Sequence, residues 1–266
     1  MTLSSFFFSK EITRSLILGK TYKNETSIQV SFFYAVPNLE CIVFDKYGFQ
    51  LCNELKIAFK SLVSLKKIFI TVEERFEDFI GSKIVEHLDF YQTNSQFVNW
   101  NFISTLERLR KLRIRSEFEP EKPFFDFLKL DRLELLSIEN RTFEGEAHEI
   151  LFQTIRPLKN LKTLILSGKY VQNAVLSDKI ETLHLFWDDS YSNNSLSNDE
   201  IIDNFIRGPG VKYLYMIFPT FVFPGTPQNV DYSSLLTVDL RRYFPLLQRA
   251  QIDDDAENVP SEVIIY

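Results

Sequence analysis

The sequence has little of what several common classes of protein need. Only 8 of its 266 residues are glycine and only 2 are cysteine. So few glycines leave little material for the glycine-rich loops that hold phosphates. Two cysteines cannot build a disulfide framework or supply all four ligands of a structural zinc site. No apolar run approaches the roughly 20 residues of a membrane-spanning helix, so we expect no membrane partner.

An excess of positive charge is also absent. The chain has 30 Lys and Arg against 36 Asp and Glu, which gives a net charge of -6 at pH 7. We therefore do not expect the overall charge of the molecule to attract nucleic acid, because neutralising phosphates requires clustered Lys and Arg. Both cysteines, Cys41 and Cys52, are expected to be packing thiols in a reducing compartment. The first residues do not resemble a secretory signal, which favours an intracellular location, cytoplasmic or nuclear.

Apolar residues are abundant: they make up 45% of the chain, and 26 of them are Phe. Part of this material recurs in a six-residue pattern with apolar residues at its first, fourth and sixth positions. LKKIFI at residues 65–70 and LRKLRI at residues 109–114 are two copies. The copies begin at Leu39, Leu65, Val85, Leu109, Leu133, Leu161, Ile180, Val211 and Leu247, and a degenerate copy spans residues 13–18. From Leu39 onward, successive copies begin 19 to 36 residues apart.

The segments between the copies have a helix-like composition. Residues 50–62 place three leucines and an alanine on one helical stripe. Residues 197–200 read SNDE, a capping box, and precede a second apolar helical stretch. Because nearly half of the residues are apolar, the six-residue pattern also arises by chance. The helix-like composition of the segments between the copies is the further evidence for a true repeat. The sequence therefore predicts alternating strands and helices.

Over residues 36–252 this alternation resembles the leucine-rich repeat superfamily. The resemblance implies an α/β solenoid, with a curved parallel sheet on its concave side and irregular helices on its convex side. It also implies a single domain over residues 1–266, of about nine or ten repeats, with caps at about residues 1–35 and 218–266. The ninth position of the repeats lacks the family's usual Asn or Cys. Such irregular repeats are similar to those of F-box-type substrate receptors, although no F-box-like segment is visible at the N-terminus.

The sequence contains no pattern typical of an active site or a metal centre. The three histidines, His87, His148 and His184, have no second histidine at metal-ligand spacing. Acidic runs at residues 188–189 and 253–255 are expected to be solvated loops rather than divalent-ion sites. We therefore expect a protein without catalytic residues, metal or cofactor, and an enzyme with an unrecognised site is a remote alternative.

The third, fifth and seventh positions of the repeats are expected to line the concave face. One strand places Lys111, Arg113 and Arg115 there, three cations suited to an acidic or phosphorylated peptide. RNA or DNA is a weaker alternative for this strand. A further alternative is that neighbouring strands neutralise the charge, because the register places Asp89 beside Arg113 and Glu139 beside Arg115.

A second group on this face is aromatic and apolar, a composition enriched in protein interfaces. It comprises Ile165, His184, Phe186, Tyr213, Tyr215 and Ile217, with Trp187 just beyond. The alternative is that the chain itself covers this group, because residues 218–244 are apolar enough to fold back over this end as a cap. The predicted partner-binding residues of both groups are Tyr91, Lys111, Arg113, Arg115, Ile165, His184, Phe186, Tyr213 and Tyr215.

These features predict a non-catalytic scaffold or adaptor that binds a protein partner on its concave face, as part of a larger complex. The resemblance to F-box-type receptors narrows this role to the substrate-recognition part of a ubiquitin-ligase complex. The alternative is a binder of nucleic acid or of a phosphopeptide through the strand that carries Lys111, Arg113 and Arg115.

Overall fold

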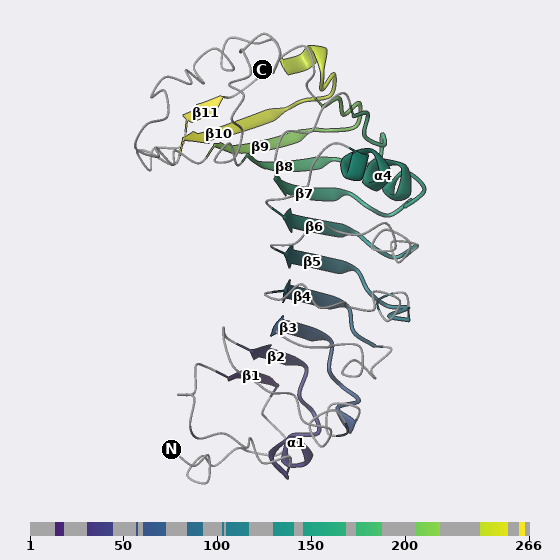
Figure 1. Ribbon diagram of the computed structural model, residues 1–266, viewed down its shortest axis with the longest axis vertical. Helices are drawn as coiled ribbons and strands as arrows, with labels where there is room; N and C mark the ends of the chain where they lie inside the picture. Colours follow the sequence, from purple (N-terminus) through teal and green to yellow (C-terminus); the bar gives the residue numbers. More distant parts are fainter. Residues whose placement is uncertain are drawn as a thin grey trace. The chain divides into compact units, whose positions relative to one another are not determined.

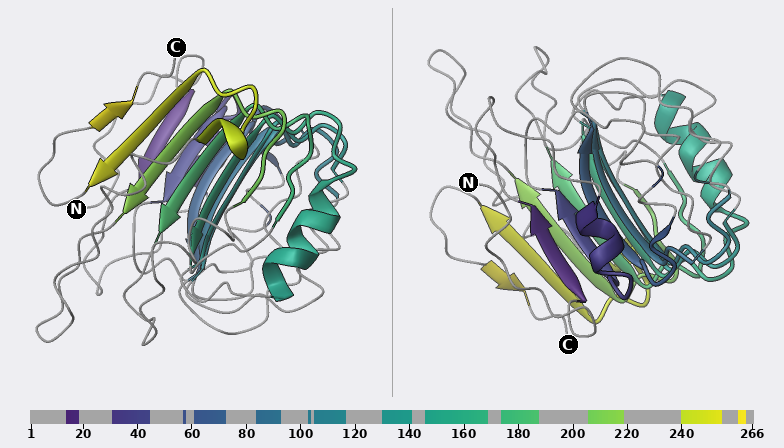
Figure 2. Two further views of the ribbon diagram at one scale, coloured as in Figure 1. Left: turned by 90° about the horizontal axis from the view of Figure 1, so that it is seen from above. Right: turned by 90° about the horizontal axis from the view of Figure 1, so that it is seen from below.

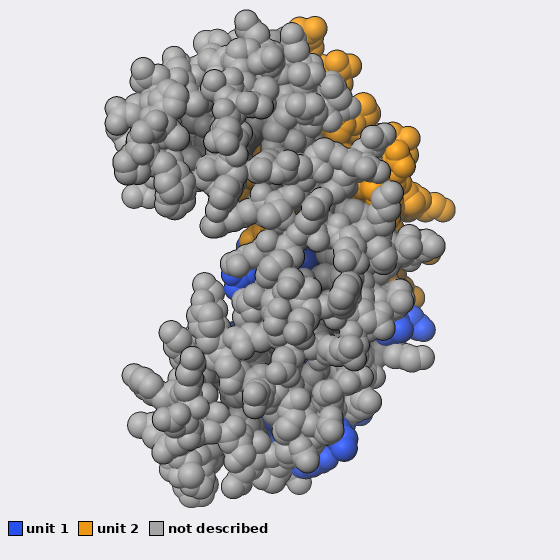
Figure 3. Space-filling model, in the orientation of Figure 1, with its two compact units in different colours: residues 1–117 blue, residues 118–266 orange. Residues whose placement is uncertain are grey.

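The computed structural model describes residues 14–18, 31–44, 57, 61–72, 84–92, 103, 105–116, 130–140, 146–168, 174–187, 206–218, 240–254 and 261–263. The chain divides into two compact units, residues 1–117 and residues 118–266 (Figure 3). Repeats of a solenoid contact mainly their neighbours, so such a division falls as readily between two repeats of one domain as between two domains. The single domain over residues 1–266 therefore stays a prediction.

The first unit is built on parallel strands that follow one another in sequence order (Figure 1). Its strands are β1 (Ser15–Leu18), β2 (Cys41–Phe44), β3 (Lys67–Val72), β4 (His87–Gln92) and β5 (Lys111–Ser116). The short helix α1 (Ser31–Ala35) lies between β1 and β2 in the sequence.

The second unit repeats this arrangement and ends on an antiparallel strand. Its parallel strands are β6 (Leu135–Asn140), β7 (Thr163–Gly168), β8 (Thr182–Trp187), β9 (Tyr213–Phe218) and β10 (Arg249–Asp254). The last strand, β11 (Ser261–Val263), pairs antiparallel with β10. Helix α4 (Glu146–Ile155) lies between β6 and β7 in the sequence, and Figure 2 shows it facing one side of the strands of its unit.

The strands confirm the six-residue pattern, but the start of each strand is shifted relative to the start of its copy. From β2 to β10, each strand begins at the third residue of its copy, so the copy that starts at Leu109 gives β5 from Lys111. The first residue belongs instead to the preceding turn, because the N–H of Leu109 donates to the carbonyl of Leu106 at 2.9 Å. The degenerate copy at residues 13–18 contains β1.

The apolar positions of the pattern form the core of each unit. The residues at the fourth position are all buried: Ile42, Ile68, Leu88, Leu112, Leu136, Leu164, Leu183, Leu214 and Ala250. The first-position residues, such as Leu39 and Leu161, are buried as well. Each buried Leu or Ile side chain contributes roughly 1.5–3 kcal/mol to folding, and in a strand alternate side chains point to opposite faces. The third, fifth and seventh positions must therefore face away from the core.

Consecutive repeats share a backbone carbonyl group. The N–H groups of Lys66 and Lys67 both donate to the carbonyl of Glu40, each at 2.9 Å. The other carbonyl groups that accept two such bonds are those of Arg14, Lys66, Glu86, Glu134, Lys162, Glu181 and Lys212. All of these acceptors are second-position residues, so the backbone itself fixes where each strand starts beside its neighbour.

The side chains at the second position alternate in charge, and we call this row the second-position ladder. It runs Arg14, Glu40, Lys66, Glu86 and Arg110 in the first unit, and Glu134, Lys162, Glu181 and Lys212 in the second. The carboxylate of Glu40 lies 3.9 Å from both Arg14 Nη1 and Lys66 Nζ. In the second unit, Lys212 Nζ lies 3.4 Å from Glu181 Oε2. This alternation of charge was not predicted from the sequence.

Few of the described residues between the strands are helical. The described residues include α1, α4 and the short 3-10 helix η3 (Leu240–Arg242). Of the predicted helix over residues 50–62, Ile57 and Ser61 are helical, and most of the remainder lies outside the described residues, as does the capping box at residues 197–200. No helix in the described part of the chain is long and apolar enough to cross a membrane.

Candidate partner-binding faces

The side chains at the third, fifth and seventh positions of the strands form what we call the outer face of each unit. Most of those whose burial is described are exposed or half-buried, as the alternation predicts. Asp89 and Ser137 are exceptions, with exposed fractions of 5% and 0%. Both are small polar residues at the fifth position, where hydrogen bonds and ion pairs to neighbouring side chains replace contact with water.

The outer face of the first unit is ordered in rows across β3, β4 and β5. Lys67, His87 and Lys111 are register partners in one row. Phe69, Asp89 and Arg113 form the next row, and Tyr91 and Arg115 are partners in a third. The structure thus brings together four of the predicted partner-binding residues: Tyr91, Lys111, Arg113 and Arg115.

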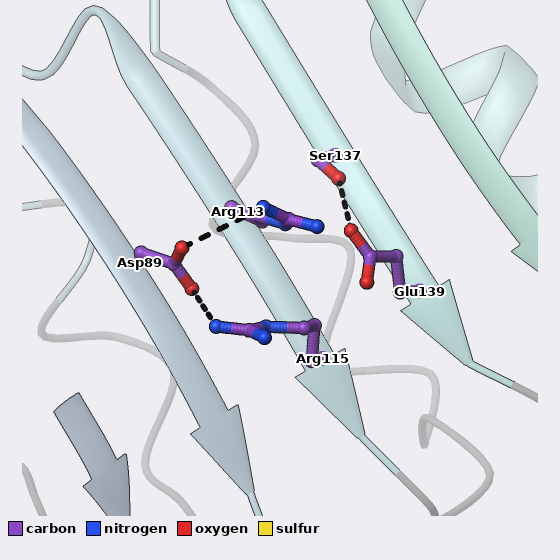
Figure 4. Close-up of polar contacts among 5 residues, drawn as sticks. All are labelled: Asp89, Arg113, Arg115, Ser137 and Glu139. Carbon is purple, nitrogen blue, oxygen red and sulfur yellow. Dashed lines mark hydrogen bonds and ion pairs between the residues drawn. The ribbon is translucent and has the colours of Figure 1, made fainter. Parts of the chain in front are cut away.

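Asp89 binds both arginines of β5 (Figure 4). Its Oδ2 lies 3.9 Å from Nη1 of Arg113, and its Oδ1 accepts a hydrogen bond from Nη2 of Arg115 at 3.0 Å. The predicted pairing of Asp89 with Arg113 is confirmed. The contact with Arg115 was missed, although diagonal neighbours on adjacent strands lie within reach of long side chains and this rule could have found it.

One buried carboxylate between two half-exposed guanidinium groups leaves the cluster with an excess of one positive charge. The side chains of Arg113 and Arg115 are 41% and 37% exposed, against 7% for Asp89. A charge-assisted hydrogen bond to Asp89 restricts the rotamer of Arg115, and Arg113 is held by a longer ion pair with the same carboxylate. Arg115 also lies over the ring of Tyr91, with its guanidinium carbon 5.6 Å from the ring centroid, within cation–π range.

Glu139, which the sequence pairs with Arg115, belongs to the second unit. There its carboxylate accepts a hydrogen bond from the hydroxyl of Ser137 at 3.2 Å (Figure 4). The pairing of Glu139 with Arg115 stays a prediction.

His87 lies between Lys67 and Lys111 in the first row. Its ring contacts Phe69 edge to face, with the centroids 4.8 Å apart. Burial lowers the pKa of His87 from its ordinary value of 6.5, Asp89 opposes this shift, and Lys111, Lys67 and Arg113 add to it. The imidazole is therefore mainly neutral at pH 7, and the positive charge of this face comes from lysine and arginine.

The outer face of the second unit gathers the predicted aromatic group on β7, β8 and β9. Ile165 is the register partner of His184, and His184 is the partner of Tyr215. The rings of His184 and Tyr215 are stacked, with centroids 4.4 Å apart and planes 16° apart. Burial lowers the pKa of His184. Offset or stacked ring pairs of this kind add roughly 0.5–1.5 kcal/mol beyond their buried area.

The remaining members of this group are less buried. Tyr213 is 38% exposed and Phe186 is half-buried. The side chains of Trp187 and Ile217 lie outside what the structure describes, as do residues 219–239 of the predicted cap. Whether that segment covers the aromatic group therefore stays a prediction.

Within the described residues, no three His, Cys, Asp or Glu side chains gather as a metal site requires. Cys41 is a free thiol on the outer face of β2, opposite Lys67. Burial raises the pKa of this thiol and Lys67 opposes the rise, so it is mainly protonated at pH 7. Cys52, the acidic run at residues 188–189 and the side chain of His148 lie outside the described residues.

Comparisons with known proteins assign no family to this chain. No protein-family model matches the sequence, and no curated protein matches it. Among solved structures, a leucine-rich repeat protein of Leptospira interrogans is 11% identical, with 90% of this chain and 89% of the other covered at a TM-score of 0.24. A TM-score of this size carries no weight in assigning the fold, and nothing in these comparisons supports the resemblance to F-box-type receptors. Parallel strands in sequence order, with buried first and fourth positions, are consistent with a leucine-rich-repeat-like α/β arrangement in each unit.

Proposed function

We propose that the chain is a non-catalytic scaffold that binds a protein partner through its outer faces. One observation carries the proposal: side chains from successive repeats are aligned in rows on rigid strands and remain partly exposed. On β9 the aromatic side chain of Tyr213 is 38% exposed, beside the stacked pair of His184 and Tyr215. Large exposed aromatic side chains are enriched at the centres of protein interfaces.

The physical advantage of such a face is that its side chains are ordered before the partner arrives. Strands β2 to β4 and β7 to β10 are each paired with a strand on both sides, and shared carbonyl groups set the register. Ordering a side chain at an interface costs about 0.5–1.5 kcal/mol, so side chains that are already packed lose less on binding.

The test compares two tyrosines in one binding experiment. A tagged full-length chain would be used to isolate its partner, and the affinity would then be measured with purified components. Tyr213→Ala is expected to weaken the complex at least tenfold, because an exposed aromatic residue at an interface centre contributes about 1.4 kcal/mol or more. Tyr34→Ala is the matched control, because Tyr34 is 51% exposed on α1, away from the outer face.

Two results would contradict the proposal. One is equal weakening by both tyrosine changes, and the other is a complex that survives Tyr213→Ala, Tyr215→Ala and also Lys67→Glu combined with Lys111→Glu on the outer face of the first unit. Thermal unfolding of each variant must be followed, because Tyr215 stacks on His184 and its loss also costs stability.

A narrower role, substrate recognition within a ubiquitin-ligase complex, rests only on the irregularity of the repeats. It predicts that ligase subunits co-purify with the chain and that the captured partner becomes ubiquitinated in a reconstituted reaction. A partner that is captured without any ligase subunit would remove this narrower role and leave the scaffold proposal intact.

A second candidate function is nucleic-acid binding, favoured by the three cations of β5. Affinity for nucleic acid falls with salt, with a slope set by the number of phosphates neutralised. Lys111→Glu combined with Arg113→Glu would then abolish binding of a labelled oligonucleotide. The absence of salt-dependent binding would exclude this function.

A further inference from the structure

Positive charge is concentrated on the outer face of β3, β4 and β5, against the charge of the chain as a whole. The whole chain carries a net charge of -6. The third, fifth and seventh positions of these three strands hold one acidic residue, Asp89, and these basic ones: Lys67, Lys111, Arg113 and Arg115. With His87 mainly neutral, the described charges of this face sum to an excess of cations that favours an anionic partner.

The cations are spread around a centre and do not converge on one point. Lys67 and Lys111 lie two strands apart in the same row, a separation of about 10 Å at 4.7–4.9 Å per strand. Arg113 and Arg115 are alternate residues of β5, roughly 7 Å apart along the strand. Asp89 lies between these positions, and its negative charge repels a single anion placed at the centre.

We propose that this face binds an acidic segment of a partner protein, whose carboxylates contact Lys67, Lys111 and the arginine pair. The segment crosses β3, β4 and β5 and passes over the buried Asp89. The inference rests on the proposed scaffold function and names the chemistry of its partner. Carboxylates spaced along an extended chain reach the separated cations, whereas one phosphate group reaches only one or two of them.

Asp89 gives the arginines a second property that suits this partner. It contacts one terminal nitrogen of each guanidinium group, at 3.9 Å and 3.0 Å. A guanidinium group holds its N–H donors in a fixed plane, so contact with one terminal nitrogen also restrains the direction of the others. Arg115 is also positioned by the ring of Tyr91. The guanidinium plane of Arg115 is therefore oriented before an acidic side chain arrives, which lowers the cost of binding.

A long polyanion such as nucleic acid fits this face less well. Four cations limit the number of phosphates that the described face neutralises, so its salt dependence would be shallow. The whole chain has a net charge of -6 even with the cations of this face included, so the rest of the molecule repels an extended polyanion beyond the face. A short acidic segment does not meet this repulsion.

The test measures binding of short fluorescent peptides to the full-length chain by anisotropy. A peptide of alternating glutamate and serine is expected to bind, and the same peptide with glutamine in place of glutamate is expected to bind at least tenfold more weakly. A phosphoserine peptide of equal length and a single-stranded oligonucleotide are compared under the same buffer and salt. The glutamate peptide is expected to bind at least as tightly as either of them.

Charge reversal on the face supplies the decisive variant. Lys67→Glu combined with Lys111→Glu is expected to weaken glutamate-peptide binding at least tenfold. The matched control, Lys159→Glu combined with Lys179→Glu, changes the net charge equally at exposed lysines outside the outer face, and a change of less than twofold is expected. Neither pair includes a residue bound to Asp89, so the thermal unfolding of both variants should stay close to that of the parent chain.

The inference is overturned if the glutamine peptide binds equally well, if both double variants weaken binding alike, or if the phosphoserine peptide or the oligonucleotide binds at least tenfold more tightly. Its failure is distinguishable from failure of the scaffold proposal. If the acidic peptide fails but a captured partner still depends on Tyr213, only the inference about the first unit is lost. If neither the charge reversal on the first unit nor Tyr213→Ala on the second weakens binding, the inference and the scaffold proposal are both lost.

Discussion

Arg115 donates a hydrogen bond to Asp89 at 3.0 Å although its register partner on β4 is Tyr91. The contact is diagonal, so one carboxylate on β4 restrains two alternate residues of β5 at once. The guanidinium group of Arg115 also lies over Tyr91, so both neighbours on β4 fix its orientation. A strand whose side chains are held in this way presents its charges in a fixed pattern.

Asp89→Asn is expected to destabilise the fold. The change removes the negative charge that two half-buried guanidinium groups share, and weakening the charge-assisted hydrogen bond from Arg115 costs about 1–3 kcal/mol. Urea unfolding at neutral pH measures the difference. Asp131→Asn is the control, because the Asp131 side chain is exposed and its change should fall within about 0.5 kcal/mol. Equal effects of the two changes would show that the cluster has no structural role.

The same Asp89→Asn variant should bind the glutamate peptide more tightly than the parent chain. Its outer face has lost its one described acidic residue and keeps four cations. Stability and peptide affinity are then expected to change in opposite directions, which a general loss of folding does not produce. Weaker peptide binding by a variant that is still folded would argue that the orientation of the arginines matters more than their charge.

Lys66→Glu is expected to disturb the second-position ladder. It places a carboxylate beside Glu40 and next to Glu86, where the parent chain has an ion pair of 3.9 Å. Like charges on neighbouring strands are destabilising by about 0.2–1 kcal/mol, and the difference should shrink at high salt because these side chains are exposed. Lys159→Glu serves as the control for net charge. A ladder that contributes nothing would give equal unfolding midpoints for the two variants.

Folding stability is expected to fall on mild acidification because of His184. Burial lowers its pKa in the folded chain below the ordinary value of 6.5, so the unfolded chain binds the proton more readily. This contribution is fully present above pH 6.5 and is lost as the pH falls from there toward the lowered pKa of the folded state. His184→Phe keeps an aromatic ring against Tyr215 and removes the titration. Its stability should therefore depend less on pH between 7 and 5 than that of the parent, whereas an identical slope would contradict the assignment.

Acidification is expected to strengthen binding of the glutamate peptide through His87. Its proton adds a positive charge between Lys67 and Lys111, and a bound carboxylate favours that protonated form. The peptide's own carboxylates, with an ordinary pKa of about 4.3, stay ionised above pH 5.5 or so. His87→Gln should bind with little change between pH 7.5 and 5.5. A parent chain whose affinity is flat over this range would exclude a contribution from His87.

Much of the strand architecture could be predicted from the sequence, because burial repeats at fixed spacing. The pattern that starts at Leu109 locates β5 to within two residues. The shift arises because the first apolar residue closes a turn through its N–H group, a backbone contact that side-chain patterns do not encode. The strand Ser15–Leu18 was predictable from a degenerate copy only because its neighbours repeat the pattern clearly.

The chemistry of the candidate site was less predictable. Lys111, Arg113 and Arg115 were placed correctly on one face, since alternate residues of a strand share a side. Alternation along the strand assigns Asp89 to the exposed side, so its burial could not be predicted. Asp89 is buried because two arginine side chains of β5 cover it. The stacking of His184 on Tyr215 likewise depends on register between strands that lie far apart in the sequence.

The doubly accepting carbonyl groups at the second positions have a consequence for how this molecule can be altered. Since main-chain atoms align each strand with the next, the identity of the outward side chains is largely decoupled from the framework that displays them. Exchanging the residues at those outward positions should therefore create new recognition surfaces on an unchanged backbone, provided that no proline removes either of the two donated N–H groups.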